Sequence, residues 1–91
     1  MKKKIIQTTT FKNSYKELVT NAPKLKKSII DATTLFDEDR ENSVLRDHAL
    51  EGVMICLRSF SVTPNIRILY LEKEDKIIFL NIGTHKQIYK R

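Results

Sequence analysis

The chain has 91 residues and one cysteine, and its formal net charge is +6. A chain of this length buries one modest hydrophobic core, so we expect a single domain over residues 1–91. No apolar run approaches the roughly 18 residues of a membrane span. The apolar stretch after the N-terminal lysines is also too short for a signal peptide, so we expect a cytoplasmic protein with no membrane partner.

The cysteine content argues against two kinds of site. Cys56 cannot form an internal disulfide, and it lies in an apolar run where we expect a small buried residue. The chain has neither a cysteine pair nor an HExxH motif, so we expect no metal site. No cofactor is implied.

The charge is unevenly distributed along the chain. Residues 1–27 carry eight Lys and one Glu, residues 28–51 carry two Arg and seven acids, and residues 52–91 are basic again. Basic ends around an acidic middle indicate a positive face, which attracts polyanions such as RNA or DNA. The charge alone is explained equally well by an ordinary basic surface.

The start of the chain predicts a strand followed by a helix. Residues 4–9 are rich in β-branched side chains and show no helical period, which indicates a strand. Thr9 or Thr10 is placed to cap the helix that follows. The apolar face of this helix recurs at i, i+4, i+7 and i+8 and consists of Phe11, Tyr15, Leu18 and Val19.

A second helix follows a break at residues 21–23. We expect Pro23 in its first turn, where a missing N–H is tolerated. Its apolar stripe recurs at spacings of four, three and four, is widened by Leu35, and consists of Leu25, Ile29, Ala32 and Phe36. Two helices with a short connection form a helical hairpin.

The rest of the chain predicts strands. Residues 37–43 form a charged loop, and residues 44–52 show no clear element, although Gly52 suits a turn. Three strands with short links are then expected over Val53–Phe60, Asn65–Leu71 and Lys76–Ile82, with a short helical turn over His85–Tyr89. Short links between consecutive strands favour an antiparallel meander.

The expected fold is therefore α+β, with the order β-α-α-β-β-β and a short final helix. A four-stranded, mainly antiparallel sheet with the helical hairpin packed on one face would bury both apolar stripes. The other face of the sheet stays open. An open face lined with Arg and His suits a single-stranded polyanion.

Four short motifs in residues 45–89 carry the most specific signal. They are a D-H-x-L-x-G element ending at Gly52, an arginine (Arg58) followed by V-x-P-N, an R-x-x-Y element starting at Arg67, and a final G-T-H-x-x-x-Y ending at Tyr89. In this order they resemble the RelE/ParE superfamily of bacterial toxins. The resemblance is closest to the YafQ-type mRNA interferases of type II toxin–antitoxin systems. The N-terminal half agrees only in element order and in its F-K-x-x-Y-K helix start.

This resemblance implies a RelE-like fold and a metal-independent endoribonuclease. Such a toxin would cut mRNA in the decoding site of a translating ribosome and would be silenced by a cognate antitoxin. The 2′-hydroxyl of the RNA would attack the adjacent phosphate and leave a 2′,3′-cyclic phosphate. The implied partners are therefore the antitoxin, the ribosome and mRNA.

The same resemblance assigns roles to individual residues. His85 is the expected general acid, and His48 is the base or orients it, because imidazole titrates near neutral pH. Arg67 would stabilise the developing phosphate charge. Tyr89 would stack on a base or orient His85. The expected RNA contacts are Arg58, Asn65, Asn81 and Lys86.

The motifs also depart from the YafQ pattern. Ser61 stands where that branch has a second histidine, Asn65 replaces an aspartate, Ile66 a tryptophan and Asn81 an arginine. The general base is therefore the least defined role. Arg67 also has a structural interpretation, as a surface arginine paired with Glu72 or Glu74.

Two other functions stay open at this point. ParE-like relatives inhibit DNA gyrase without cutting RNA, and such inhibition needs no acid–base pair. A catalytically decayed toxin would still bind its antitoxin and RNA. The departures at Ser61, Asn65 and Asn81 motivate this second alternative.

Overall fold

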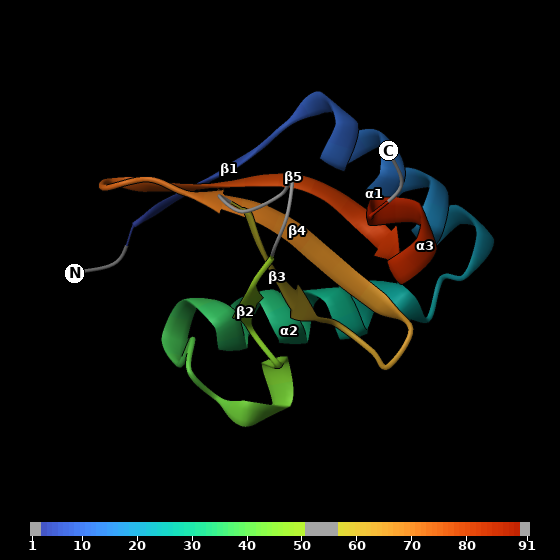
Figure 1. The fold of residues 1–91 in the computed structure, drawn as a ribbon. Helices are drawn as coiled ribbons and strands as arrows, with labels where there is room; N and C mark the ends of the chain where they lie inside the picture. Colours follow the sequence, from blue (N-terminus) through green and yellow to red (C-terminus); the bar gives the residue numbers. More distant parts are fainter. Residues whose placement is uncertain (1–2, 51–56, 90–91) are drawn as a thin grey trace.

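The computed structural model describes residues 3–50 and 57–89 of the chain. Their elements, in order, are β1 (Lys4–Gln7), α1 (Thr9–Asn21), α2 (Leu25–Glu38), the 3₁₀ turn η1 (Ser43–Leu45), β2 (His48–Ala49), β3 (Leu57–Ser61), β4 (Ile66–Glu72), β5 (Lys76–Thr84) and α3 (His85–Ile88) (Figure 1). No helix among the described residues has the length and apolar character needed to cross a membrane.

The strands form one mixed sheet in the order β1-β5-β4-β3-β2. β1 runs parallel to β5, and the other neighbours are antiparallel. The α+β class and the element order are confirmed, but the expected number of four strands is wrong. The fifth strand is β2, which has two residues and pairs with Ser59 and Arg58 of β3. A strand of two residues has no periodicity that a sequence could reveal.

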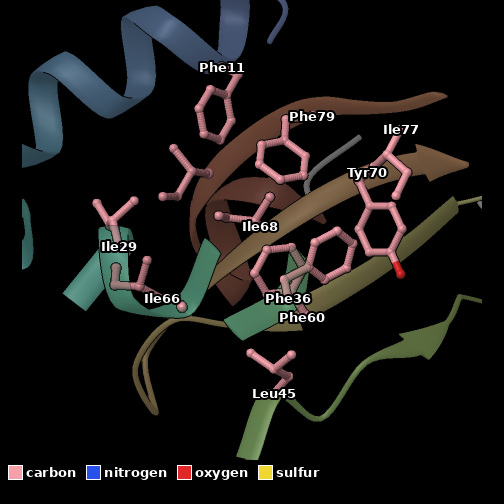
Figure 2. Packing of buried hydrophobic residues seen from close by; sticks show 12 residues of the cluster. Phe11, Ile29, Phe36, Leu45, Phe60, Ile66, Ile68, Tyr70, Ile77 and Phe79 are labelled. Carbon is pink, nitrogen blue, oxygen red and sulfur yellow. The ribbon is translucent and has the colours of Figure 1, made fainter. Parts of the chain in front are cut away.

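The two long helices cover one face of the sheet, as expected. The stripe residues Phe11, Ile29, Ala32 and Phe36 are buried, and the other stripe residues pack beside them. The sheet meets the helices with the buried side chains of Phe60, Ile66, Ile68, Tyr70, Ile77, Phe79 and Ile82. Figure 2 shows Phe36 among these rings; it stacks on Phe60 with centroids 4.2 Å apart and meets Tyr70 edge-on at 5.0 Å.

The starts of both helices differ from expectation by one or two residues. α1 is capped by Thr8 instead of Thr9 or Thr10, because the Thr8 hydroxyl accepts the Phe11 N–H at 3.1 Å. That hydroxyl also lies 3.0 Å from the Phe79 carbonyl, which ties the helix start to β5. α2 begins at Leu25, so Pro23 precedes the helix, and the Pro23 carbonyl accepts the Lys26 N–H at 3.1 Å.

A β-bulge in β5 decides which of its residues face the helices. Leu69 pairs with Asn81 and Tyr70 with Phe79, so Leu80 is the extra residue. The bulge shifts the alternation by one position. Ile82 therefore faces the core, whereas Asn81 and Gly83 fall on the open face with their register partners on β4.

The remaining expected strands agree with the structure over most of their length. β4 and β5 each differ from the expected bounds by one or two residues. β3 starts at Leu57 and ends at Ser61, one residue beyond the expected Phe60. The expected strand residues 53–56, the turn at Gly52 and the burial of Cys56 lie outside the described residues.

Replacing Phe36 with alanine should remove the centre of the aromatic cluster. We expect the free energy of unfolding, measured by urea denaturation, to fall by about 3–5 kcal/mol. Ile30 lies on the same helix but is 50% exposed, so Ile30→Ala should cost less than about 1 kcal/mol. Equal stabilities for the two variants would contradict the packing described above.

Candidate functional site

The open face of the sheet carries a cluster of polar side chains. In the sheet register His48 lies opposite Ser59, and Ser61 lies opposite Arg67. These four residues point away from the helices, because their neighbours Phe60 and Ile68 point into the core. The expectation that Arg and His line the open face is met by Arg67 and His48.

The Arg67 guanidinium is the centre of this cluster. Its Nε donates to the Ser59 hydroxyl at 3.1 Å and its Nη1 to the Ser61 hydroxyl at 2.6 Å. Its Nη2 donates to the Arg46 carbonyl at 2.9 Å and to the Ser59 carbonyl at 3.2 Å. Glu72, a partner considered from the sequence, instead binds Arg40 and Lys3 on the other side of the sheet.

His48 is oriented by the backbone before it. Its Nδ1 lies 2.9 Å from the Arg46 carbonyl and 3.3 Å from Arg67 Nη2. A carbonyl only accepts hydrogen bonds and a guanidinium only donates them, so one tautomer cannot satisfy both contacts. The shorter contact favours a proton on Nδ1. The lone pair then resides on Nε2, and the His48 ring is exposed.

The Arg46 carbonyl reaches both side chains because of an unusual backbone conformation. Arg46 follows η1 and has φ 50° and ψ 43°, in the left-handed region. Non-glycine residues adopt this region at a small energetic cost. Here the conformation turns the chain into β2 and presents the carbonyl to Arg67 and His48.

The end of β5 supplies the second histidine. Thr84 caps α3 with a capping box, in which its hydroxyl accepts the Gln87 N–H and Gln87 accepts the Thr84 N–H. His85 and Tyr89 are four residues apart, and their rings pack edge-on with centroids 4.2 Å apart. The Tyr89 hydroxyl then reaches the Ser59 hydroxyl at 2.6 Å. The expected helical turn at His85 is confirmed.

Gly83 has a steric role before this turn. A Cβ at this position would lie 2.6 Å from Gln87 Oε1 and 3.2 Å from Gln87 Cβ. The Gln87 side chain occupies that space because it completes the capping box. A side chain at position 83 would therefore displace Gln87 and loosen the turn that carries His85.

Two surface hollows meet at His85 and Lys86. One has a volume of about 430 Å³ and is lined by Pro64, Asn65, Arg67, Thr84, His85 and Lys86. The other, of about 620 Å³, is lined by His85, Lys86, Gln87 and Tyr89. The structure thus gathers six of the eight candidate residues: His48, Arg67, Tyr89, His85, Asn65 and Lys86.

The structure does not bring Arg58 and Asn81 to this cluster. Arg58 lies opposite Tyr70, on the helix-facing side of the sheet, and its Nε donates to the Tyr70 hydroxyl at 3.1 Å. Asn81 is on the open side of β5 by strand alternation, but it lines a separate hollow of about 270 Å³ together with residues of α1 and with Gln87. The contacts of Arg58 therefore indicate a structural role on the helix-facing side of the sheet.

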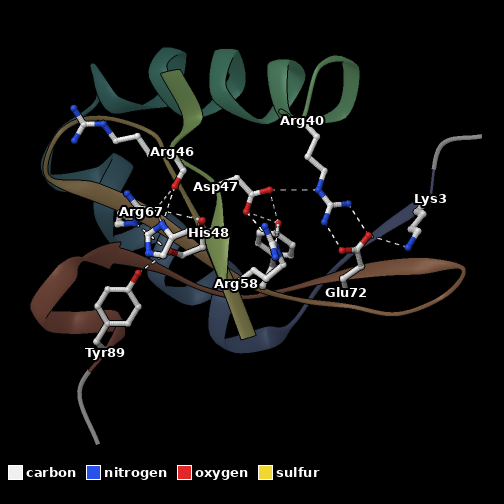
Figure 3. A network of polar contacts seen from close by, with 11 residues as sticks. Lys3, Arg40, Arg46, Asp47, His48, Arg58, Arg67, Glu72 and Tyr89 are labelled. Atoms are coloured by element: carbon white, nitrogen blue, oxygen red, sulfur yellow. Dashed lines mark hydrogen bonds and ion pairs between the residues drawn. The ribbon is translucent and has the colours of Figure 1, made fainter. Parts of the chain in front are cut away.

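Arg58 belongs to a polar network that supports β2 from the inner side (Figure 3). The buried Asp47 carboxylate accepts the Tyr70 hydroxyl at 2.6 Å and lies 3.4 Å from both Arg58 Nε and Arg40 Nε. Burial raises the pKa of the Tyr70 hydroxyl, and the bond to Asp47 raises it further. His48 directly follows Asp47. The network that holds Asp47 on the inner side therefore also restricts the backbone of His48, whose side chain faces outward.

Arg40 extends the network to Glu72. Its guanidinium binds both carboxylate oxygens of Glu72, and Lys3 adds a contact of 2.8 Å. The Arg40 hydrogen bonds lower the pKa of Glu72 from 4.5 to about 2. The Arg40 guanidinium also lies 5.5 Å from the Phe36 ring centroid and 5.6 Å from that of Tyr70.

Sequence reasoning missed the two serines and the Arg46 carbonyl. Ser59 and Ser61 alternate with the core residue Phe60, which is a signal that both face away from the core. The Arg46 carbonyl has no comparable signal, because its direction depends on a positive φ. Within residues 3–50 and 57–89, no group of three or more His, Cys, Asp or Glu could hold a metal ion.

Comparison with known protein families identifies the family of the chain. The family described as "Bacterial toxin of type II toxin-antitoxin system, YafQ" matches residues 3–90. The chain belongs to this YafQ toxin family. A comparison with curated protein sequences found no match.

Solved structures show the same fold. YafQ from Escherichia coli superposes with a TM-score of 0.81 and 20% identity over 96% of this chain and 98% of that one. The Escherichia coli DinJ–YafQ toxin–antitoxin complex gives 0.80 and 21% over 98% and 99%. A copper-bound mutant toxin from Helicobacter pylori gives 0.77 and 25% over 98% and 100%. The expected RelE-like fold of a YafQ-family toxin is thus confirmed.

The Glu72 pair should make the stability of this toxin depend on pH. The pKa of Glu72 in the folded protein, about 2, lies below its ordinary value of 4.5. The contribution of Glu72 to stability is therefore complete at pH values above 4.5 and is lost as the pH falls toward 2. Glu72→Gln should lower the free energy of unfolding by about 1–2 kcal/mol at pH 7. The difference from wild type should shrink between pH 5 and pH 2, as measured by urea denaturation.

Asp31→Asn is the matched control. Asp31 pairs with Lys27 at 3.0 Å, but both side chains are exposed, at 63% and 83%. Its removal should change the unfolding free energy by less than about 0.5 kcal/mol at pH 7. If the two variants gave the same pH profile, the Glu72 pair would not be the source of the effect.

Proposed function

We propose that this YafQ-family toxin is an endoribonuclease that cleaves mRNA on the translating ribosome. The observation that supports this most is the arrangement of the open face. One chain of contacts runs from His48 through Arg67, Ser59 and Tyr89 to His85. Two imidazoles on either side of a guanidinium are the groups that phosphodiester transesterification requires.

The proposed reaction is attack by the 2′-oxygen of the RNA on the adjacent phosphorus. A base removes the 2′-hydroxyl proton, and an acid gives a proton to the 5′-oxygen as its bond to phosphorus breaks. The products are a 2′,3′-cyclic phosphate and a 5′-hydroxyl. The protons removed and supplied balance, so the reaction needs no further reagent.

His48 is the proposed base, since the contact of its Nδ1 with the Arg46 carbonyl leaves Nε2 to accept a proton. His85 is the proposed acid, with its ring held by Tyr89 at the edge of both hollows. The chain has only these two histidines. Ser61 and Asn65, which replace ionisable residues of the YafQ pattern, take no proton near neutral pH.

Arg67 is the proposed stabiliser of the phosphorane. Nη1 carries two N–H groups, and the Ser61 hydroxyl accepts one of them. The second is left for a phosphate oxygen, and the guanidinium keeps its charge at every relevant pH. Asn65 and Lys86 line the hollow beside Arg67 and would bind the RNA there. We leave Arg58 and Asn81 out of the proposed RNA contacts.

We also propose a cognate antitoxin and the ribosome as partners. A related toxin, YafQ of Escherichia coli, is found in complex with DinJ. The net charge of +6 favours association with ribosomal RNA and with an acidic antitoxin segment. The reaction would take place in the cytoplasm, where ribosomes translate mRNA.

Replacing His85 with alanine tests the acid. In a reconstituted translation reaction, His85→Ala should cut mRNA about 10²–10⁴-fold more slowly than wild type. Cleavage is measured by primer extension. A 3′ end that carries a cyclic phosphate is recognised because it cannot be ligated until the cyclic phosphate has been opened and the phosphate removed. Ile30→Ala, on the helix side, should cut at the wild-type rate.

The cleavage experiment, together with a growth assay and a gyrase supercoiling assay, separates the alternatives. A wild-type protein that neither cuts mRNA nor arrests growth would be a decayed toxin. Inhibition of gyrase supercoiling without mRNA cleavage would indicate a ParE-like function. A wild-type rate for His85→Ala would remove His85 from the role of acid while leaving the activity in place.

Arg67→Lys tests whether the reaction needs the planar guanidinium of Arg67 and its several N–H donors, and not only a positive charge. Lysine cannot reach Ser59, Ser61 and the Arg46 carbonyl at once. We expect a cleavage rate at least about tenfold lower, with the effect mainly on kcat. Lys86→Arg, which keeps the charge at the rim of the hollow, should retain activity within about twofold. Full activity of Arg67→Lys would show that charge alone suffices.

A further inference from the structure

Ser59 lies at the junction of the two halves of the site. It has no exposed surface, although it is on the open face of the sheet, because Arg67 and Tyr89 cover it. Its hydroxyl accepts the Arg67 Nε–H at 3.1 Å and forms a hydrogen bond of 2.6 Å with the Tyr89 hydroxyl, in which either oxygen can be the donor. A serine hydroxyl has one proton and two lone pairs, so it can serve both partners.

The two partners depend on Ser59 to different degrees. Arg67 also binds the Ser61 hydroxyl and the carbonyls of Arg46 and Ser59. These bonds would hold the guanidinium if the Ser59 hydroxyl were absent. For Tyr89, in the part of the chain that the structure describes, the hydroxyl contact is the one with Ser59.

Tyr89 passes this constraint to His85. Tyr89 is the C-cap residue directly after the short α3, and its ring meets the exposed His85 ring edge-on at 4.2 Å. Ile88 is buried and anchors α3, whereas the Tyr89 ring is only partly buried. The hydroxyl bond to a buried partner on β3 restrains that ring.

We infer that Ser59 is a positioning residue that fixes the His85 ring through Tyr89. It holds no reacting atom itself. The catalytic part of this inference depends on the proposed ribonuclease function, whereas the structural part, the restraint of His85, does not. A hydroxyl at position 59 and a hydroxyl at position 89 should therefore act as one unit.

A double-mutant cycle tests this unit. Ser59→Ala and Tyr89→Phe each remove one hydroxyl, and each should lower kcat for mRNA cleavage about fivefold, as expected for one hydrogen bond. KM should change by less than about twofold, because substrate contacts are kept. The double variant should be no slower than either single variant. Multiplied effects, or a wild-type kcat for Ser59→Ala, would overturn the inference.

Thr33→Ala is the matched control. The Thr33 hydroxyl is also hydrogen-bonded, to the Ile29 carbonyl at 2.9 Å, but Thr33 is half-buried and lies on α2, on the helix side. This variant should keep the wild-type kcat. A fall in kcat equal to that of Ser59→Ala would assign the effect to general stability and would also overturn the inference.

A second measurement does not require activity. The two imidazoles should give separate proton signals in an NMR spectrum, and the neighbouring Tyr89 ring should shift those of His85. In Ser59→Ala the His85 signals should move toward those of a free imidazole, whereas in Thr33→Ala they should not. Unchanged His85 signals in Ser59→Ala would overturn the inference. A wild-type protein that does not cut mRNA would instead refute the proposed function, while the NMR result would still decide the role of Ser59.

Discussion

The hydrogen bonds of the Arg67 guanidinium hold the open face of this protein together. They join β4 to both serines of β3 and to the turn that leads into β2. β2 is only two residues long, so its ladder alone gives weak pairing. The planar fork of arginine meets several acceptors in fixed directions, which a flexible ammonium group cannot do. The position of His48 therefore depends on a side chain from another strand.

The short strand β2 is supported from both faces of the sheet. Asp47 points inward to Tyr70, Arg40 and Arg58, and His48 points outward to the Arg67 cluster. Asp47 directly precedes β2, and adjacent residues of an extended chain face opposite sides, so this segment connects the inner network to the open face. The inner ion pairs are not in the site, but they restrict the backbone that carries His48.

Much of the fold could be predicted from the sequence, because a helix or strand that buries only one of its faces has a clear periodic pattern of apolar residues. The stripes through Phe11 and Phe36 gave both helices and the face they bury. The alternation around Phe60 also contained information that motif matching overlooked. Arg58 is two residues before Phe60 and shares its face, whereas Ser59 and Ser61 lie on the other. The motif placed Arg58 and Arg67 in one site, but strand parity separates them.

Other features have no signal in a single sequence. The bulge at Leu80 changes the parity of β5, so Ile82 faces the core and Gly83 faces Arg67. The positive φ of Arg46 directs a carbonyl, and carbonyl directions are not encoded by side-chain type. Both features arise from how distant segments fit together. The candidate residues could thus be named from the sequence, but their hydrogen-bond partners could not.

Ser61, which departs from the YafQ pattern, still contributes a side-chain contact to the site. A histidine at this position would offer a second titrating group beside Arg67. The serine instead accepts a bond of 2.6 Å from Arg67 Nη1, which helps keep the guanidinium over β3 and toward the Arg46 turn. The chain has two histidines, and the proposed reaction assigns its proton transfers to His48 and His85. The hydrogen bonds of Arg67 and Ser59 link these two residues across the face of the sheet.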